Sequence, residues 1–266
     1  MNMQIRQKFV VGNWKMNTDT FEAKALAKRI ADGMNLIDKV TVILCPPFPY
    51  LALVGEIIRG SGIELGGQNM YPDDEGAYTG EVSPTMLRDL GCKYVILGHS
   101  DRRHKLNESD VFINQKVTWA LASGLDVILC VGETQEQREA KQTEAVLDRQ
   151  LSTGLSEVPN EILPRLSIAY EPIWAIGSLE HHATPQQALN AQFLIRAKLA
   201  EIVGADRAQK LTVHYGGSVD PENAAAFLSQ PGIDGALIGG ASLKADDFLA
   251  IVHAAVAETP TELQSA

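Results

Sequence analysis

The sequence contains little cysteine. Cys45, Cys92 and Cys130 are the only three in 266 residues, and no two of them form a Cys-x-x-Cys pair. This small, odd number argues against a disulfide-stapled scaffold or a cysteine-rich zinc site. Because each cysteine lies among apolar residues typical of strands, we expect three reduced, buried thiols in a cytoplasmic protein.

Basic residues are also scarce relative to acidic ones. Lys and Arg total 23 against 33 Asp and Glu, which gives a net charge of −10. This balance argues against binding to nucleic acid or to an anionic membrane. Any anionic substrate must therefore be held by local dipoles.

Long apolar runs are missing as well. Residues 1–8 lack the apolar segment of a signal peptide, and the uncharged stretch 40–55 is interrupted by Pro46, Pro47 and Pro49. We therefore expect neither a signal peptide nor a membrane span.

What the chain does contain is an alternation of strand and helix patterns. Eight short β-branched runs are separated by segments with helical spacing, which predicts a closed barrel or a doubly wound open sheet. The count of eight favours a single α/β domain over residues 1–266, a (β/α)8 TIM barrel with a loosely ordered tail from about 258. The runs are Phe9–Val11, Val40–Leu44, Ile63–Leu65, Tyr94–Leu97, Asp126–Leu129, Leu166–Tyr170, Leu211–Val213 and Ala236–Ile238.

The sequence contains capping patterns that predict where several helices begin. Thr184, Pro185 and Gln187 supply a cap, a first-turn proline and a capping-box glutamine, Thr134 to Gln137 repeats the box, and Asp220-Pro221 repeats the cap and proline. Apolar residues with helical spacing include Ile113, Val117, Ala120 and Leu121, and Leu189, Phe193, Ala197 and Ala200.

The segment 169–177, Ala-Tyr-Glu-Pro-Ile-Trp-Ala-Ile-Gly, is the most informative. Pro172 ends the preceding strand, because it lacks a ladder donor and restricts Glu171 to extended geometry. A carboxylate at a strand end, followed by a rigid, apolar segment ending in glycine, has the layout of a catalytic base under a lid. The alternative is a strand followed by a packed loop.

Two other strand ends carry polar groups. Asn13 and Lys15 lie two residues apart, so both can face one anionic ligand, although Lys15 alone also fits a solvated surface charge. His99 precedes a helix-like turn, where the helix dipole favours a neutral imidazole. A structural histidine is the alternative.

Two glycine-rich turns follow the last two strands. Residues 215–219 and 239–242 each enter a helix, and such turns in barrels bind phosphate through backbone N–H groups. An ordinary tight turn explains one such motif more easily than two. The adjacent His181 and His182 lack metal-ligand spacing, and we expect no metal site.

Taken together, these segments resemble triosephosphate isomerase, along with Gly76-Ala77-Tyr78-Thr79-Gly80-Glu81, and the match covers nearly the whole chain. The resemblance implies an enzyme of glycolysis and gluconeogenesis that interconverts dihydroxyacetone phosphate and D-glyceraldehyde 3-phosphate through an enediolate without a cofactor. It assigns Glu171 as the base, His99 as the electrophile, and Asn13 and Lys15 as substrate-binding groups. It further assigns phosphate binding to Gly177, Ser218, Gly239 and Gly240, and supporting roles to Ser100, Asp101 and Thr79.

The resemblance also implies a homodimer. Loop 69–84 would insert into the partner subunit, with Thr79 at its tip supporting Asn13 and Lys15 of the partner subunit. Sixteen mostly polar residues without an obvious helix or strand favour a functional loop over a solvated surface loop.

The chain departs from the family pattern at two places. Asp101 replaces the usual glutamate, so we expect it to reach its partners less well and to lower turnover. The segment 178–184 is one residue longer than the corresponding segment of the family pattern. It therefore alters the hinge at the far end of the lid that follows Glu171. Two other functions stay open: isomerisation of a tetrulose phosphate, and a phosphate-binding barrel without catalysis.

Overall fold

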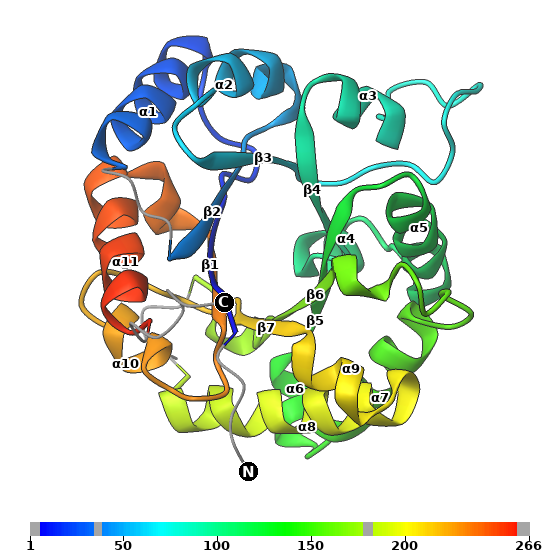
Figure 1. Ribbon diagram of the computed structural model, residues 1–266. Helices are drawn as coiled ribbons and strands as arrows, with labels where there is room; N and C mark the ends of the chain where they lie inside the picture. The colour runs from blue at the N-terminus through cyan, green and yellow to red at the C-terminus, as the bar shows by residue number, and fades with distance from the viewer. Residues whose placement is uncertain (1–5, 35–38, 178–182, 260–266) are drawn as a thin grey trace.

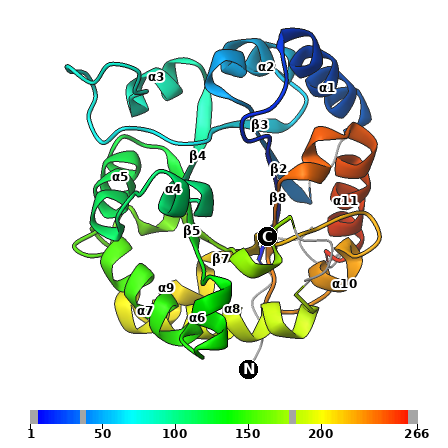
Figure 2. The same ribbon diagram turned by 180° about the vertical axis from the view of Figure 1, so that it is seen from behind.

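The protein folds as a closed (β/α)8 barrel, seen in a computed structural model that describes residues 6–34, 39–177 and 183–259. Within these residues eight parallel strands pair in chain order from β1 to β8, and β1 closes the barrel by pairing with β8. Figure 1 shows the strands surrounded by a ring of helices, and Figure 2 shows this ring from behind. The predicted single-domain TIM barrel is confirmed.

Each predicted strand run forms a strand, often one or two residues longer than predicted. Leu211 is the exception, because it ends the preceding helix and lies just before its strand. The strands are β1 (Lys8–Asn13), β2 (Val40–Cys45), β3 (Ile63–Gly67), β4 (Cys92–Leu97), β5 (Asp126–Val131), β6 (Leu166–Tyr170), β7 (Thr212–Tyr215) and β8 (Gly235–Ile238).

Helices connect the strands on the outside of the barrel. The α-helices of the described ranges are α1 (Thr20–Gly33), α2 (Leu51–Ile57), α3 (Pro84–Asp89), α4 (Ser100–Lys105), α5 (Asp110–Ala122), α6 (Gln135–Glu139), α7 (Thr143–Gly154), α8 (Pro185–Val203), α9 (Ala205–Lys210), α10 (Ala224–Leu228) and α11 (Ala245–Ala257). Short 3₁₀ turns are η1 (Phe48–Tyr50), η2 (Leu163–Arg165), η3 (Ile173–Ala175) and η4 (Gly240–Leu243).

Two of the three predicted helix starts are confirmed. Thr184 and Thr134 each cap a helix and form a capping box with the glutamine three residues later. At Asp220-Pro221 the predicted start is three residues early, since α10 begins only at Ala224. Asp220 and Asn223 nevertheless make the reciprocal contacts of a capping box, each side chain accepting a hydrogen bond from the other's backbone N–H at 2.9 and 3.1 Å.

Both segments predicted from helical spacing form helices, α5 and α8. In α8, however, the apolar spacing does not mark the buried face. In α5 the four expected apolar residues are all buried. In α8 the buried stripe runs through Ala188, Gln192, Ile195 and Leu199, which leaves Phe193 55% exposed. The fully buried Gln192 shows why apolar spacing alone misplaced this face.

Alternating strand side chains build two layers of core. One set points into the barrel, from Val11 and Ile43 to Ile128 and Leu237, and the other packs against the helices. All three cysteines are buried and free, as expected, and burial raises the pKa of Cys92 to about 12.

The tail expected from about 258 is only partly described. Thr259 is buried and its hydroxyl donates to the Ala255 carbonyl at 2.8 Å, so the chain is still packed there. Residues 260–266 lie outside the described range. Among the described helices, none combines the length and apolar character needed to cross a bilayer.

His214 in β7 makes stability depend on pH. The side chain is fully buried, neither ring nitrogen has a hydrogen-bond partner, and burial lowers its pKa from 6.5 to about 3. The neutral form stabilises the fold fully above pH 6.5, and this contribution is lost as the pH falls toward 3. From pH 7 to pH 5 we expect a loss of about 2 kcal/mol of unfolding free energy from this residue.

Urea unfolding of His214→Leu measures this effect. The variant should lose less stability than the parent between pH 7 and pH 5, by the amount given above. Parallel pH profiles for the two proteins would show that His214 does not titrate on unfolding.

Candidate active site

Side chains from five strand ends meet in one pocket of about 560 Å³ at the carboxyl end of the barrel. This is the end at which barrel enzymes carry their chemistry. The eight residues predicted to bind or transform the substrate all line it: Asn13, Lys15, His99, Glu171, Gly177, Ser218, Gly239 and Gly240.

Glu171 lies buried at the end of β6 and is held by the loop after β4. Its Oε2 accepts a hydrogen bond from the Ser100 backbone N–H at 2.8 Å, and its Oε1 lies 3.3 Å from the Ser100 hydroxyl and 2.9 Å from His99 Nε2. Burial favours the neutral acid, but His99, the Ser100 N–H and the charge of Lys15 outweigh it and lower the pKa of Glu171. The carboxylate is therefore ionised and ready to accept a proton.

The tautomer of His99 follows from its contacts. His99 caps α4, and its Nδ1 accepts a hydrogen bond from the Asp101 backbone N–H at 3.1 Å. A nitrogen that accepts carries no proton, so in a neutral ring the proton lies on Nε2. The Nε2–H group faces the pocket and Glu171, which suits a hydrogen-bond donor to a substrate oxygen.

Lys15 and Asn13 are fixed together after β1. The Lys15 backbone has the left-handed value φ 52°, and its N–H donates to Asn13 Oδ1 at 3.1 Å. Gln68 at the end of β3 donates to the Lys15 carbonyl at 2.8 Å. These contacts hold a strained residue in place, as is common at functional sites.

Asp101 reaches its partners despite its short side chain, so the expected poorer reach is wrong. Its Oδ2 lies 3.1 Å from Lys15 Nζ and its Oδ1 lies 2.7 Å from Lys105 Nζ. Burial opposes the charge, but Lys105 and Lys15 outweigh it and lower the pKa of Asp101 to about 2.

Because Asp101 already contacts Lys15, lengthening it should change little. For Asp101→Glu we expect kcat and KM to stay within about three-fold of the parent, the range of a partly exposed ion pair. Steady-state kinetics of the purified variant measure this. A ten-fold rise in kcat would instead show that the missing methylene limits turnover.

The segment after Glu171 is attached to the loop after β7. Residues Ile173–Ala175 form η3, and Ser218 Oγ donates to the Ala175 carbonyl at 3.0 Å and accepts from the Gly177 N–H at 3.3 Å. Gly177 has φ 66°, a conformation that favours glycine. The altered hinge at 178–182, with His181 and His182, lies outside the described residues.

Sequence reasoning missed Glu133, which follows β5. It is completely buried and accepts hydrogen bonds from the Tyr170 hydroxyl at 3.0 Å and from Trp174 Nε1 at 3.0 Å. Arg138 adds a 3.2 Å ion pair. Glu133 thus joins the end of β6 to the lid segment. Its place two residues after the end of β5 was the available signal.

Thr79 does not reach this pocket. It lies exposed in the loop that leaves the barrel between β3 and α3 (Figure 1). Ser100 and Asp101 do contact site residues, as described above. In the ranges that the structure describes, no group of three or more His, Cys, Asp or Glu is placed to hold a metal ion.

The fold and the pocket define a (β/α)8-barrel enzyme whose site combines a buried carboxylate, an imidazole and an ammonium with glycine-rich turns. A family model described as triosephosphate isomerase matches residues 8–255. The chain belongs to the triosephosphate isomerase family.

The sequences of similar proteins match this chain along nearly their full length. The triosephosphate isomerase of Chloroflexus aurantiacus is 47% identical over 249 residues, covering 94% of this chain and 99% of that protein. The protein of the same name from Carboxydothermus hydrogenoformans is 48% identical over 252 residues, covering 95% and 100%.

Proposed function

We propose that this enzyme interconverts dihydroxyacetone phosphate and D-glyceraldehyde 3-phosphate, with Glu171 as the base and His99 as the electrophile. The observation that carries the proposal is the meeting of Glu171, His99 and Lys15 in one pocket with the glycines of the β7 and β8 turns. A carboxylate, a neutral donor and a cation are the groups that proton transfer next to a carbonyl requires.

In this mechanism Glu171 exchanges its present partners for the substrate. It gives up the Ser100 N–H and the His99 Nε2–H, which at present favour its charged form. Losing them raises its proton affinity when it removes a proton from the carbon beside the carbonyl. His99 Nε2–H and Lys15 then stabilise the enediolate oxygens. The hydroxyl proton passes from one oxygen to the other through His99, which gives up its Nε2 proton to one oxygen and takes the proton of the other, and Glu171 returns the carbon-bound proton to the neighbouring carbon.

The phosphate group would lie among Gly177, Ser218, Gly239 and Gly240. A side chain is absent at three of these positions, so the backbone can approach an anion closely. A Cβ placed on Gly240 would meet nothing within 4 Å, which leaves room for a ligand. Residues 175–177 would form the lid that covers the phosphate and shields the reactive intermediate from water, with residues 172–174 as its entering hinge.

We also propose that the enzyme is a homodimer formed through loop 69–84. Figure 1 shows this loop projecting from the barrel beside α3. Its tip exposes Tyr78, which packs against Tyr71 with ring centroids 4.1 Å apart, and Met16 next to Lys15 is 95% exposed. Sedimentation equilibrium should therefore give twice the 28.8 kDa chain mass.

We further propose a cytoplasmic location, which the three buried free thiols support.

A coupled assay tests the activity. The purified enzyme is offered triose phosphate and, in parallel, a tetrulose phosphate with one more carbon. We expect turnover of the triose phosphates with much higher kcat/KM. A preference for the tetrulose phosphate would favour the alternative isomerase, and phosphate binding without turnover of either would favour a non-catalytic barrel.

A further inference from the structure

Among the described residues, the pocket is lined by few positive charges for a site that takes a doubly charged phosphate. The charged side chains of this part of the lining are two lysines, Lys15 and Lys244, and three carboxylates, Glu171, Asp220 and Asp247. The chain as a whole carries a net charge of −10. An approaching dianion therefore meets repulsion unless a cation at the rim offsets it.

Lys15 does not offer a free charge, since its ammonium lies 3.1 Å from Asp101. Lys244 differs. It directly follows η4, the turn that contains Gly240, and its side chain is 76% exposed. Its ammonium lies 3.5 Å from Asp247, which is longer than a charge-assisted hydrogen bond. Its charge is thus only partly neutralised.

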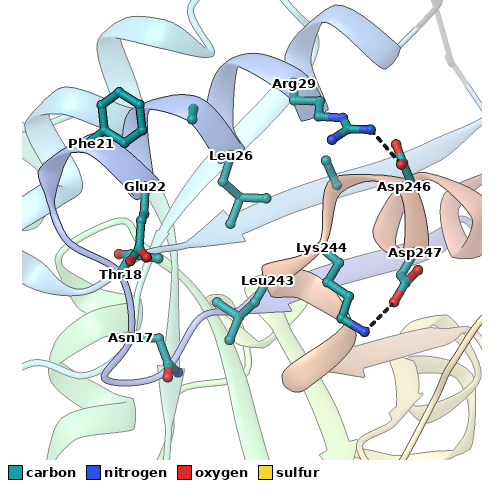
Figure 3. Close-up of a pocket in the computed structure, with 12 residues that line it drawn as sticks. Asn17, Thr18, Phe21, Glu22, Leu26, Arg29, Leu243, Lys244, Asp246 and Asp247 are labelled. Carbon is teal, nitrogen blue, oxygen red and sulfur yellow. Dashed lines mark hydrogen bonds and ion pairs between the residues drawn. The ribbon is translucent and has the colours of Figure 1, made fainter.

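The position of Lys244 adds to this difference. A hollow of about 720 Å³ lies beside the pocket, between α1 and the start of α11, and Figure 3 shows Lys244 on the α11 side of it, with its ammonium directed to Asp247 of that helix. Lys244 lines both the hollow and the pocket. It therefore stands at the rim, on the side of the glycine turn proposed to hold the phosphate.

We propose that Lys244 is a substrate-steering residue that draws the phosphate dianion to the Gly239–Gly240 turn, and that Asp247 restrains it. This inference rests on the proposed function, because it takes a phosphorylated substrate as the ligand. Lys244 acts before chemistry and does not touch the reacting carbons, so it should affect kcat/KM and not kcat.

The test compares Lys244→Gln and Asp247→Asn with a matched pair at the opposite end of the barrel. Lys93, near the start of β4, pairs with Glu64 at 2.9 Å, so Lys93→Gln and Glu64→Gln make the same charge changes far from the pocket. At 0.01 M ionic strength, where charges act over about 30 Å, we expect kcat/KM to fall about three- to five-fold for Lys244→Gln and to rise about two-fold for Asp247→Asn. The differences should shrink at high salt, with kcat unchanged throughout.

Calorimetric titration with inorganic phosphate supplies a readout independent of turnover, and Lys244→Gln should weaken binding at low salt. The inference is overturned if Lys244→Gln behaves as Lys93→Gln does in both measurements, or if it lowers kcat at unchanged KM. An inactive parent enzyme would instead overturn the proposed function, and the phosphate titration would still decide the role of Lys244.

Discussion

Glu171→Gln should lower kcat by about 10³-fold, within the range that general base catalysis contributes. The amide keeps the shape of the carboxylate and an oxygen that can accept from the Ser100 N–H, which the carboxylate binds at 2.8 Å. It cannot accept a proton from carbon at neutral pH. The effect therefore isolates the proton transfer, and corresponds to about 4 kcal/mol of activation free energy.

Two measurements accompany the kinetics. Titration with inorganic phosphate should give the parent affinity within about three-fold, because three of the four proposed phosphate residues, Ser218, Gly239 and Gly240, follow other strands. Glu171→Asp, which keeps the charge but retracts it by one methylene, should retain more activity than the glutamine variant. If Glu171→Gln kept a tenth of the parent kcat, another group would have to be the base.

Gly132→Ala should lower kcat/KM by about 100-fold and cost about 3 kcal/mol of stability, the upper range for overpacking. A Cβ at Gly132 would lie 1.8 Å from the Glu171 carbonyl oxygen and 2.6 Å from its carbonyl carbon. The backbone cannot easily move away at Gly132, just after β5, or at Glu171, just after β6. Gln150 bonds both the N–H and the carbonyl of Gly132, at 2.8 and 3.1 Å. The added methyl must therefore displace Glu171.

Gly154→Ala is the matched control for this prediction. Gly154 is the last residue of α7, and a Cβ there would meet only Leu129 Cδ2 at an ordinary 3.4 Å. We expect parent kinetics and unchanged or slightly raised stability. Thermal unfolding and steady-state kinetics of both variants settle the comparison. A Gly132→Ala enzyme with parent kcat/KM would show that the backbone at Glu171 tolerates the shift.

The altered lid hinge lies outside the described residues, but two other expectations failed for identifiable reasons. Phe193 has the helical spacing of a buried residue, yet the polar Gln192 occupies the buried face of α8 and leaves Phe193 55% exposed. Asp101 is one methylene short, yet Lys105, one turn later, and Lys15 both reach it. Local patterns do not register a buried polar side chain or such compensating partners.

Local chemistry alone determined the eight strands, most helix starts and the groups that carry the proposed reaction. Strand runs and caps depend on neighbours in sequence, and Pro172 ends its strand whatever surrounds it. Barrel closure suffices to bring the strand ends together, so the meeting of Glu171, His99 and Lys15 was predictable. Tertiary structure decided the proton on His99 Nε2, the burial of Glu133, the space at Gly132 and the exposure of Lys244. Each of these depends on distances between residues far apart in the chain, which only packing sets.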